Sequence, residues 1–417
     1  MALHNNQAIA AASAGEKAST SRISQARAGR LPKLEYSESW IRSDNPVFVF
    51  SSLLSQHQFG EQNFLVGPLN RPDFLNNFQS QLTVEQNVYD AGKTRHAGQS
   101  AEISRQISAE TRRRATDEVI AATARAYYDA VLSAEELKAA EQAVRSAEAD
   151  LRRANAVRAA GLSTDVDVLS IRVHLAAVDE QRIRRSADLD VARAALNDVL
   201  ALPLDAPHTL TSPLSRAAVS LDAVTDYEGS AIQQRPEAHQ AQLFTKLAKT
   251  QADDARSALL PQAYVRGGFE ADRQRFYDRG GANWSVSAGL HWNLFNGFAD
   301  RSRIEETKTL VQKSEAEKKQ TDSSIRLQVR RAWADLTAAE QRIEAARAVV
   351  AEAEESLRIT QNRYEAGLST VTDLLRTETA VLESRTRYLA AIHDQRIAAT
   401  MLELASGRLN ADSEVLN

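Results

Sequence analysis

One short sequence of a kind that is typical of helix starts occurs twice in this chain. Gly-Leu-Ser-Thr occurs at residues 161–164 and again at 367–370, and an aspartate follows each threonine three residues later, as Asp167 and Asp373. A threonine at a helix N-cap accepts a backbone hydrogen bond, and a carboxylate in the first turn interacts favourably with the helix dipole. The glycines interrupt helix-forming sequence. The pattern therefore predicts the tips of two antiparallel helical hairpins.

Residues that commonly perform catalysis are scattered through the chain. The eight histidines include no pair at i, i+4 spacing, and the chain has no cysteine, which excludes disulfides, thiolate metal sites and a cysteine nucleophile. The sequence has no glycine-rich phosphate loop and no serine elbow. We therefore expect no enzyme, no cofactor and no metal site. A net charge of −4 gives no electrostatic reason to expect nucleic acid as a partner.

The two tips interrupt long tracts that favour helix. No proline lies between residues 73 and 202 or after Pro261, and no glycine separates Gly98 from Gly161 or Gly297 from Gly367. Proline in a helix interior costs about 3 kcal/mol or more, so these gaps permit very long helices. Apolar residues recur every three or four positions between charged ones, as in coiled coils. A helix from about residue 93 to 159 would be about 100 Å long.

The chain consists of two copies of one unit. Asn-Val-Tyr-Asp at residues 87–90 corresponds to Asn-Leu-Phe-Asn at 293–296 with the same offset, 206 residues, that separates the two tips. Upstream the offset grows to 229 residues, so the first copy carries an insertion. We predict a first repeat at residues 1–208 with a loop insertion at 42–77, a linker at 209–227, and a second repeat at 228–417.

Each copy also contains strand patterns. Residues 78–89 and 283–294 alternate apolar and polar side chains, with aromatic residues near the ends, and weaker patterns follow Pro32 and Pro261. This length suits a tilted membrane-spanning strand, although a small soluble hairpin packed on the helices is the alternative. Four strands cannot close a membrane barrel. If they cross a membrane, several chains must contribute, and three chains would supply twelve strands.

The ordered, duplicated set of motifs resembles the TolC-like outer-membrane efflux and secretion channel family. The motifs are Ala-Arg-x-x-x-Leu-Pro at 26–32 and 255–261, the two Asn-containing helix starts, the paired tips, and Gln-Arg-Pro-Glu-Ala at 234–238. The resemblance implies a mostly α fold with a small β part. Its long coiled-coil helical hairpins form two internal repeats, and four strands per chain contribute to a trimeric, 12-stranded outer-membrane β-barrel continued by a periplasmic α-barrel.

The resemblance also implies a function and partners. The protein would be the passive exit duct of a tripartite efflux pump or type I secretion system, working as a homotrimer with a periplasmic adaptor (membrane fusion) protein and an inner-membrane transporter. It would contact outer-membrane lipid and extend its helices into the periplasm. The first residues contain no signal peptide, so we expect a truncated chain. The alternative is a soluble coiled-coil scaffold without a pore.

A gate beside the tips is a further expectation from the resemblance. Asp373 occupies the first of two acidic gate positions, whereas Arg376 occupies the second, so a double acidic ring is not expected. Tyr364 and Asp167 match a pair that ties neighbouring hairpins together, and Ser369 replaces an arginine of that lock. Helix capping alone is the alternative role of both aspartates. The residues expected to bind the adaptor are those of the tips: Gly161, Leu162, Ser163, Thr164, Gly367, Leu368, Ser369 and Thr370.

Overall fold

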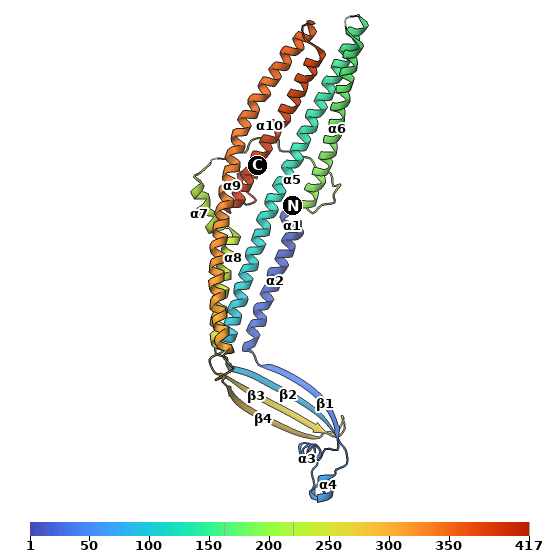
Figure 1. The fold of residues 1–417 in the computed structure, drawn as a ribbon. Helices are drawn as coiled ribbons and strands as arrows, with labels where there is room; N and C mark the ends of the chain where they lie inside the picture. The colour runs from blue at the N-terminus through green and yellow to red at the C-terminus, as the bar shows by residue number, and fades with distance from the viewer. Residues whose placement is uncertain (162, 220, 417) are drawn as a thin grey trace. The chain divides into compact units, whose positions relative to one another are not determined.

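The computed structural model describes residues 1–161, 163–219 and 221–416 (Figure 1). The chain consists of two compact units. Residues 1–16, 107–242 and 316–417 belong to the first, here called the hairpin unit. Residues 17–106 and 243–315 belong to the second, here called the strand unit. Each unit thus combines segments from both halves of the sequence.

Four helices form two hairpins, and their ends keep the offset of the sequence repeat. Helices α5 (Lys93–Ala159) and α9 (Ala299–Glu365) are each 67 residues long. They are followed by α6 (Asp165–Val199) and α10 (Val371–Ser406), which complete the hairpins (Figure 1). The start and end of α5 and the start of α6 each recur 206 residues later in the second copy. The long helix predicted for residues 93–159 is present with those bounds.

The core of the hairpin unit follows the apolar seam of the long helices. Ile325, Val329 and Leu336 of α9 are fully buried at helical spacing. They pack in one cluster with alanines and larger apolar residues of α5 and α10, and with α7 (Val224–Gln234). Small side chains at many seam positions permit the helices to approach closely. This seam fixes the register in which polar residues of the different helices meet.

The strand unit contains one antiparallel sheet in the order β1-β2-β3-β4. Its strands are β1 (Lys33–Ser43), β2 (Leu75–Tyr89), β3 (Gln262–Arg273) and β4 (Gly281–His291). The strand predicted at 78–89 begins three residues earlier, whereas the one predicted at 283–294 ends at His291. The sequence after His291 turns into α9 through Gly297, whose positive φ of 66° ends the extended conformation.

The insertion between β1 and β2 folds into short helices, where the sequence pattern predicted a loop. It contains α3 (Pro46–Ser55), the 3₁₀ helix η2 (Glu61–Phe64) and α4 (Val66–Asn70). Asn45 caps α3 by accepting hydrogen bonds from the backbone N–H groups of Val47 and Phe48. Pro46 stands at the first helical position, where its fixed φ favours helix. Local capping therefore makes a helix in a segment rich in proline and asparagine.

The other helices connect these parts of the chain. They are α1 (Ala2–Asn5), α2 (Gln7–Arg27), η1 (Ala28–Arg30), α8 (Pro236–Ser257) and η3 (Glu414–Leu416). Among the described residues, no helix combines the length and the apolar character that crossing a bilayer requires.

Candidate functional site

The two hairpin tips adopt the same backbone turn. Gly161 and Gly367 have positive φ angles of 76° and 72°, a region that side chains with a Cβ atom rarely adopt. Each glycine N–H donates to a carbonyl three residues earlier, which ends the preceding helix. Most tip residues are solvent-exposed, with Ser163 and Ser369 half-buried. Leu162, also predicted to bind the adaptor, lies outside the described residues. The tips are therefore accessible turns of defined shape.

Both helices that follow the tips begin with a capping box. The hydroxyl of Thr164 accepts from the backbone N–H of Asp167 at 3.3 Å, and the carboxylate of Asp167 accepts from the Thr164 N–H at 3.1 Å. Thr370 and Asp373 repeat both bonds at 3.2 Å. Hydrogen bonds from the threonines lower the pKa of both aspartates, with the backbone N–H most important for Asp167 and the hydroxyl for Asp373. The hydroxyls of Ser163 and Ser369 also donate to these carboxylates, at 3.0 and 3.3 Å. The capping threonines and the adjacent serines therefore provide the hydrogen bonds of both carboxylates within one chain.

Tyr364 lies where the two hairpins meet behind the tips. Its ring packs against a buried apolar cluster that includes Val168 and Ile171 of α6 and Val371 of α10. Burial raises the pKa of the Tyr364 hydroxyl, and the nearby carboxylate of Asp167 raises it further. Within the described residues, no hydrogen bond joins this hydroxyl to Asp167. The predicted pair therefore lies close enough for the charge of Asp167 to act on the Tyr364 hydroxyl, while the Tyr364 ring itself packs against the apolar cluster.

Arg376 lies one turn into α10 and is exposed. Its positive charge contributes, after the Thr370 and Ser369 hydrogen bonds, to the lowered pKa of Asp373. The described residues include no acidic side chain that forms an ion pair with Arg376. The position that the resemblance assigns to a second acidic gate residue therefore presents a positive charge at an accessible surface.

Three buried ionisable residues behind the tips were missed by the sequence prediction. His174 Nε2 lies 3.4 Å from Glu378 Oε2, and only 14% and 8% of the two side chains are exposed. Asp150 lies beside them, with 7% of its side chain exposed. The three residues come from α6, α10 and α5, and therefore connect the first hairpin with the second. We call this group the buried polar cluster.

The sequence contains a pattern that identifies these residues. Asp150 lies between the buried Ala147 and Ala154, at the spacing of the apolar seam of α5. His174 lies in the same way between Ile171 and Val178, and Glu378 between Leu374 and Val381. Each ionisable residue therefore occupies a position that helical periodicity assigns to the core.

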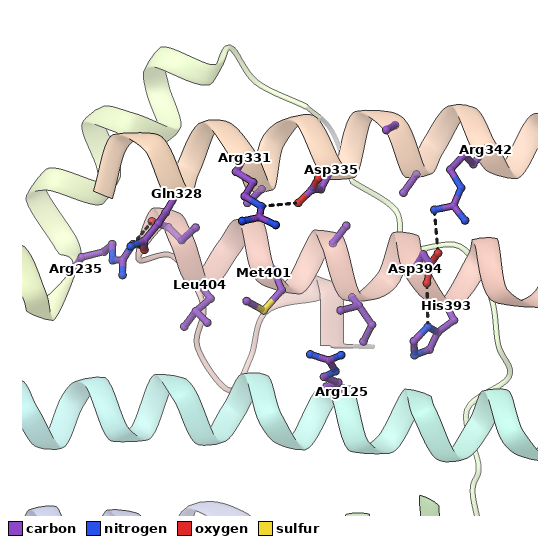
Figure 2. A pocket seen from close by; sticks show the side chains of 16 residues that line it. Arg125, Arg235, Gln328, Arg331, Asp335, Arg342, His393, Asp394, Met401 and Leu404 are labelled. Atoms are coloured by element: carbon purple, nitrogen blue, oxygen red, sulfur yellow. Dashed lines mark hydrogen bonds and ion pairs between the residues drawn. The ribbon is translucent and has the colours of Figure 1, made fainter. Parts of the chain in front are cut away.

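A second polar connection between the hairpins lies farther from the tips. His393 Nε2 of α10 contacts Asp129 Oδ1 of α5 at 2.7 Å, and Arg342 of α9 forms an ion pair with Asp394 at 3.0 Å. Figure 2 shows His393, Asp394 and Arg342 lining one side of a cavity of about 550 Å³. Burial alone would lower the pKa of His393, but Asp129 and Asp394 together raise it. The protonated imidazole is therefore stabilised at this contact.

Comparisons with known proteins cover nearly the whole chain. The outer membrane efflux protein family matches residues 1–202 and 229–408. Protein CyaE of Bordetella pertussis is 29% identical over 345 residues, which are 81% of this chain and 72% of that protein. Outer membrane protein OprJ of Pseudomonas aeruginosa is 23% identical over 377 residues, covering 88% of this chain and 74% of OprJ.

Solved structures share the fold at low sequence identity. The outer membrane channel CmeC of Campylobacter jejuni superposes with a TM-score of 0.80 and 16% identity, covering 99% of this chain and 86% of CmeC. The outer membrane protein VceC of Vibrio cholerae gives a TM-score of 0.79 and 18% identity, covering 97% of this chain and 94% of VceC. The architecture of long hairpins and a small sheet is therefore shared with known outer-membrane proteins.

Proposed function

The chain belongs to the outer membrane efflux protein family, and from this premise we propose that three copies form the passive exit duct of an efflux pump or type I secretion system. Family membership confirms the predicted resemblance and fold class. It also establishes an outer-membrane efflux or secretion channel, in preference to an enzyme or a scaffold without a pore. The trimeric assembly and its specific partners are the proposal.

The observation that carries the proposal is the open sheet of the strand unit. Within the described residues, β1 and β4 each pair with one neighbouring strand, so each leaves a row of backbone groups at an edge. Such edges are not tolerated in lipid, whereas pairing β4 of one copy with β1 of the next satisfies them. Three copies then supply twelve strands, a number within the range of known membrane sheets that close on themselves.

The surface of the sheet also supports contact with outer-membrane lipid. Leu34, Trp284 and Val286 are 67%, 79% and 69% exposed in a single copy. Exposed apolar side chains on strands of 11 to 15 residues suit the hydrocarbon region, and aromatic residues suit its boundary. In this proposal, the helical hairpins form the periplasmic part of the duct.

The tips provide the proposed contact with a periplasmic adaptor protein. Their capping boxes satisfy backbone groups within each turn, so the exposed surface needs no rearrangement before a partner binds. Asp373 and Arg376 supply opposite charges next to one tip, and Asp167 with Tyr364 supplies contacts between hairpins; these four residues are the proposed gate. We predict no energy-converting site in the duct itself. In this proposal, an inner-membrane transporter therefore supplies the energy for transport.

Mass measurement and bilayer recording test the assembly together. The purified protein in detergent is expected to have about 137 kDa of polypeptide, three times the 45.8 kDa of one chain. In a planar bilayer it is expected to give discrete conductance steps, with heat-denatured protein as the control. A monomer in every detergent, without conductance, contradicts the proposed duct.

A further inference from the structure

The buried polar cluster places two carboxyl groups and one imidazole at the junction of the two hairpins. Asp150 Oδ2 and both carboxylate oxygens of Glu378 are buried without a hydrogen bond of normal geometry in the described part of the chain. A buried unpaired carboxylate is costly, so the protonation state of the cluster affects how well the helices pack. No group of three metal-ligating side chains among the described residues lies close enough to hold a metal ion.

The arginine that contacts the cluster, Arg153, forms ion pairs with two acids. Arg153 of α5 lies 3.7 Å from Asp150 and 3.1 Å from Glu365 of α9, and it is half-exposed. Among the described residues, the only cation in contact with Glu378 is His174, which carries charge only when protonated. The remaining ionisable groups close to the cluster are Tyr364 of α9 and the residues that line the adjacent cavity, namely Glu354, Arg358 and Arg385.

The two carboxyl groups influence each other in opposite directions. Burial, reinforced by the neighbouring Glu378, raises the pKa of Asp150 to about 7, despite the charges of Arg153 and His174. Burial also tends to raise the pKa of Glu378, but His174 and Asp150 together lower it. Below about pH 7 the packed arrangement therefore favours one carboxylic acid, Asp150, beside one carboxylate, Glu378.

We propose that Asp150, His174 and Glu378 form a proton-dependent latch that holds the first hairpin against α10 behind the tips. The latch is closed while Asp150 is protonated and is weakened when Asp150 ionises, because two buried carboxylates then repel each other across one imidazole. The latch would add a pH-sensitive element to the proposed gate. Only its effect on conductance rests on the proposed function. The helix contact itself is a property of the chain.

The direction of the pH dependence follows from proton binding. An ordinary aspartate has a pKa near 3.8, so separated hairpins release a proton that the packed cluster retains. The packed arrangement is therefore favoured most at acidic pH and loses this advantage as pH rises through about 7. For a single proton, the ratio of open to closed latch changes by at most about ten-fold per pH unit.

Distance measurement across the latch tests this directly in the full chain. The protein has no cysteine, so Ala149→Cys and Ala380→Cys place spin labels only on α5 and α10, at exposed positions beside the cluster. Electron spin resonance distances in the detergent-solubilised protein are expected to lengthen and broaden between about pH 6 and about pH 8. Asp150→Asn, which is permanently neutral, is expected to keep the short distance throughout.

Matched variants separate the latch from general effects of charge. Glu148→Gln removes an exposed carboxylate from the same helix and is expected to leave the pH response unchanged. Glu378→Gln removes the second buried carboxylate and is expected to move the midpoint below about 7, since Asp150 loses the neighbour that raises its pKa. If the labelled parent shows no pH response, or if Asp150→Asn responds like it, the latch is refuted.

Bilayer recording then separates the two proposals. A pH-dependent distance in a protein that never conducts supports the latch and contradicts the proposed duct. Conductance with a pH-independent distance supports the duct and refutes the latch. If both proposals hold, Asp150→Asn abolishes the rise in open probability above about pH 7 and leaves the size of the conductance step unchanged.

Discussion

The two hairpins have equivalent tips but different interiors behind them. Thr164 with Asp167 and Thr370 with Asp373 form the same capping box in both copies. At the repeat offset of 206 residues, His174 corresponds to Ala380, a residue that cannot ionise. The duplicated capping boxes are therefore features that any hairpin of this kind requires. The buried polar cluster occurs once, and both hairpins contribute residues to it. Asymmetry within a repeat indicates where a function beyond folding resides.

The largest expected effect comes from removing the single histidine of the cluster. His174→Ala leaves Glu378 and Asp150 buried without the imidazole, and we expect the free energy of unfolding to fall by about 3 kcal/mol. Denaturant unfolding at about pH 8 measures it. Arg172→Ala is the matched control, because Arg172 is exposed and stands at the repeat position of Glu378. Equal losses of stability for both variants would show that the buried histidine contributes no more than the exposed arginine.

The tip glycines test whether the two turns are equivalent. Gly161→Ala and Gly367→Ala each introduce a Cβ atom at a positive φ, and we expect each to reduce the free energy of unfolding by about 1 to 2 kcal/mol. Apart from the adjoining residues, no described atom lies within 4 Å of the added Cβ atom at either position, so we attribute the loss to backbone strain. Thermal unfolding of the two variants gives the comparison. Clearly different losses would show that the tips are not equivalent.

The caps should contribute less than the glycines. Thr164→Ala and Thr370→Ala remove the hydroxyl that accepts from the first turn, at an expected cost of about 1 kcal/mol each. Because the pKa of each capping aspartate is lowered, the benefit of its carboxylate is present above the ordinary value and is lost as the pH falls through the lowered value. Unfolding measured at neutral and strongly acidic pH checks this. The bond from the backbone N–H to the threonine hydroxyl does not depend on pH, so the difference between wild type and variant is expected to shrink in acid without vanishing. A difference that keeps its full size in strong acid contradicts the contribution of the carboxylates.

The smallest effects are expected from single gate substitutions. Asp373→Ala removes a negative charge beside Arg376, and we expect a change in cation preference of about two-fold in bilayer recordings. Tyr364→Phe removes a hydroxyl but keeps the ring in its apolar cluster, so the change in conductance is expected to be smaller still. Glu383→Gln, farther along α10 at an exposed position, is the control. Unchanged recordings for both gate variants would assign Asp373 and Tyr364 to capping and packing alone.

The sequence predicts the helical part of this fold well because its determinants are local. Glycine and proline positions, with the offset between the tips, are sufficient to locate the ends of α5 and the starts of α6 and α10. The insertion was assigned wrongly, because α3 depends on a single cap at Asn45 in a segment otherwise typical of a loop. The ends of the strands depend on pairing partners far along the chain, so alternation alone misplaced some of them by up to three residues.

The candidate site also has one part that the sequence predicts and one part that it does not. The capping pairs were visible in the sequence because threonine and aspartate lie three residues apart. The polar cluster combines three helices, and its residues meet only through the register of the packed seams. Each of Asp150, His174 and Glu378 interrupts an apolar seam, so their positions could be flagged from the sequence, but their convergence could not.

The equal length of α5 and α9 constrains how this protein can evolve. Removing seven residues from each arm of one hairpin keeps its apolar seam in phase but draws its tip back by about 10 Å. The two tips would then lie at different levels, and a partner that binds both would lose about half of its contact surface. The proposed contact of both tips with one adaptor therefore predicts that insertions and deletions occur in matched sets across the two repeats. Relatives of different helix length are expected to differ by the same number of residues in α5 and α9.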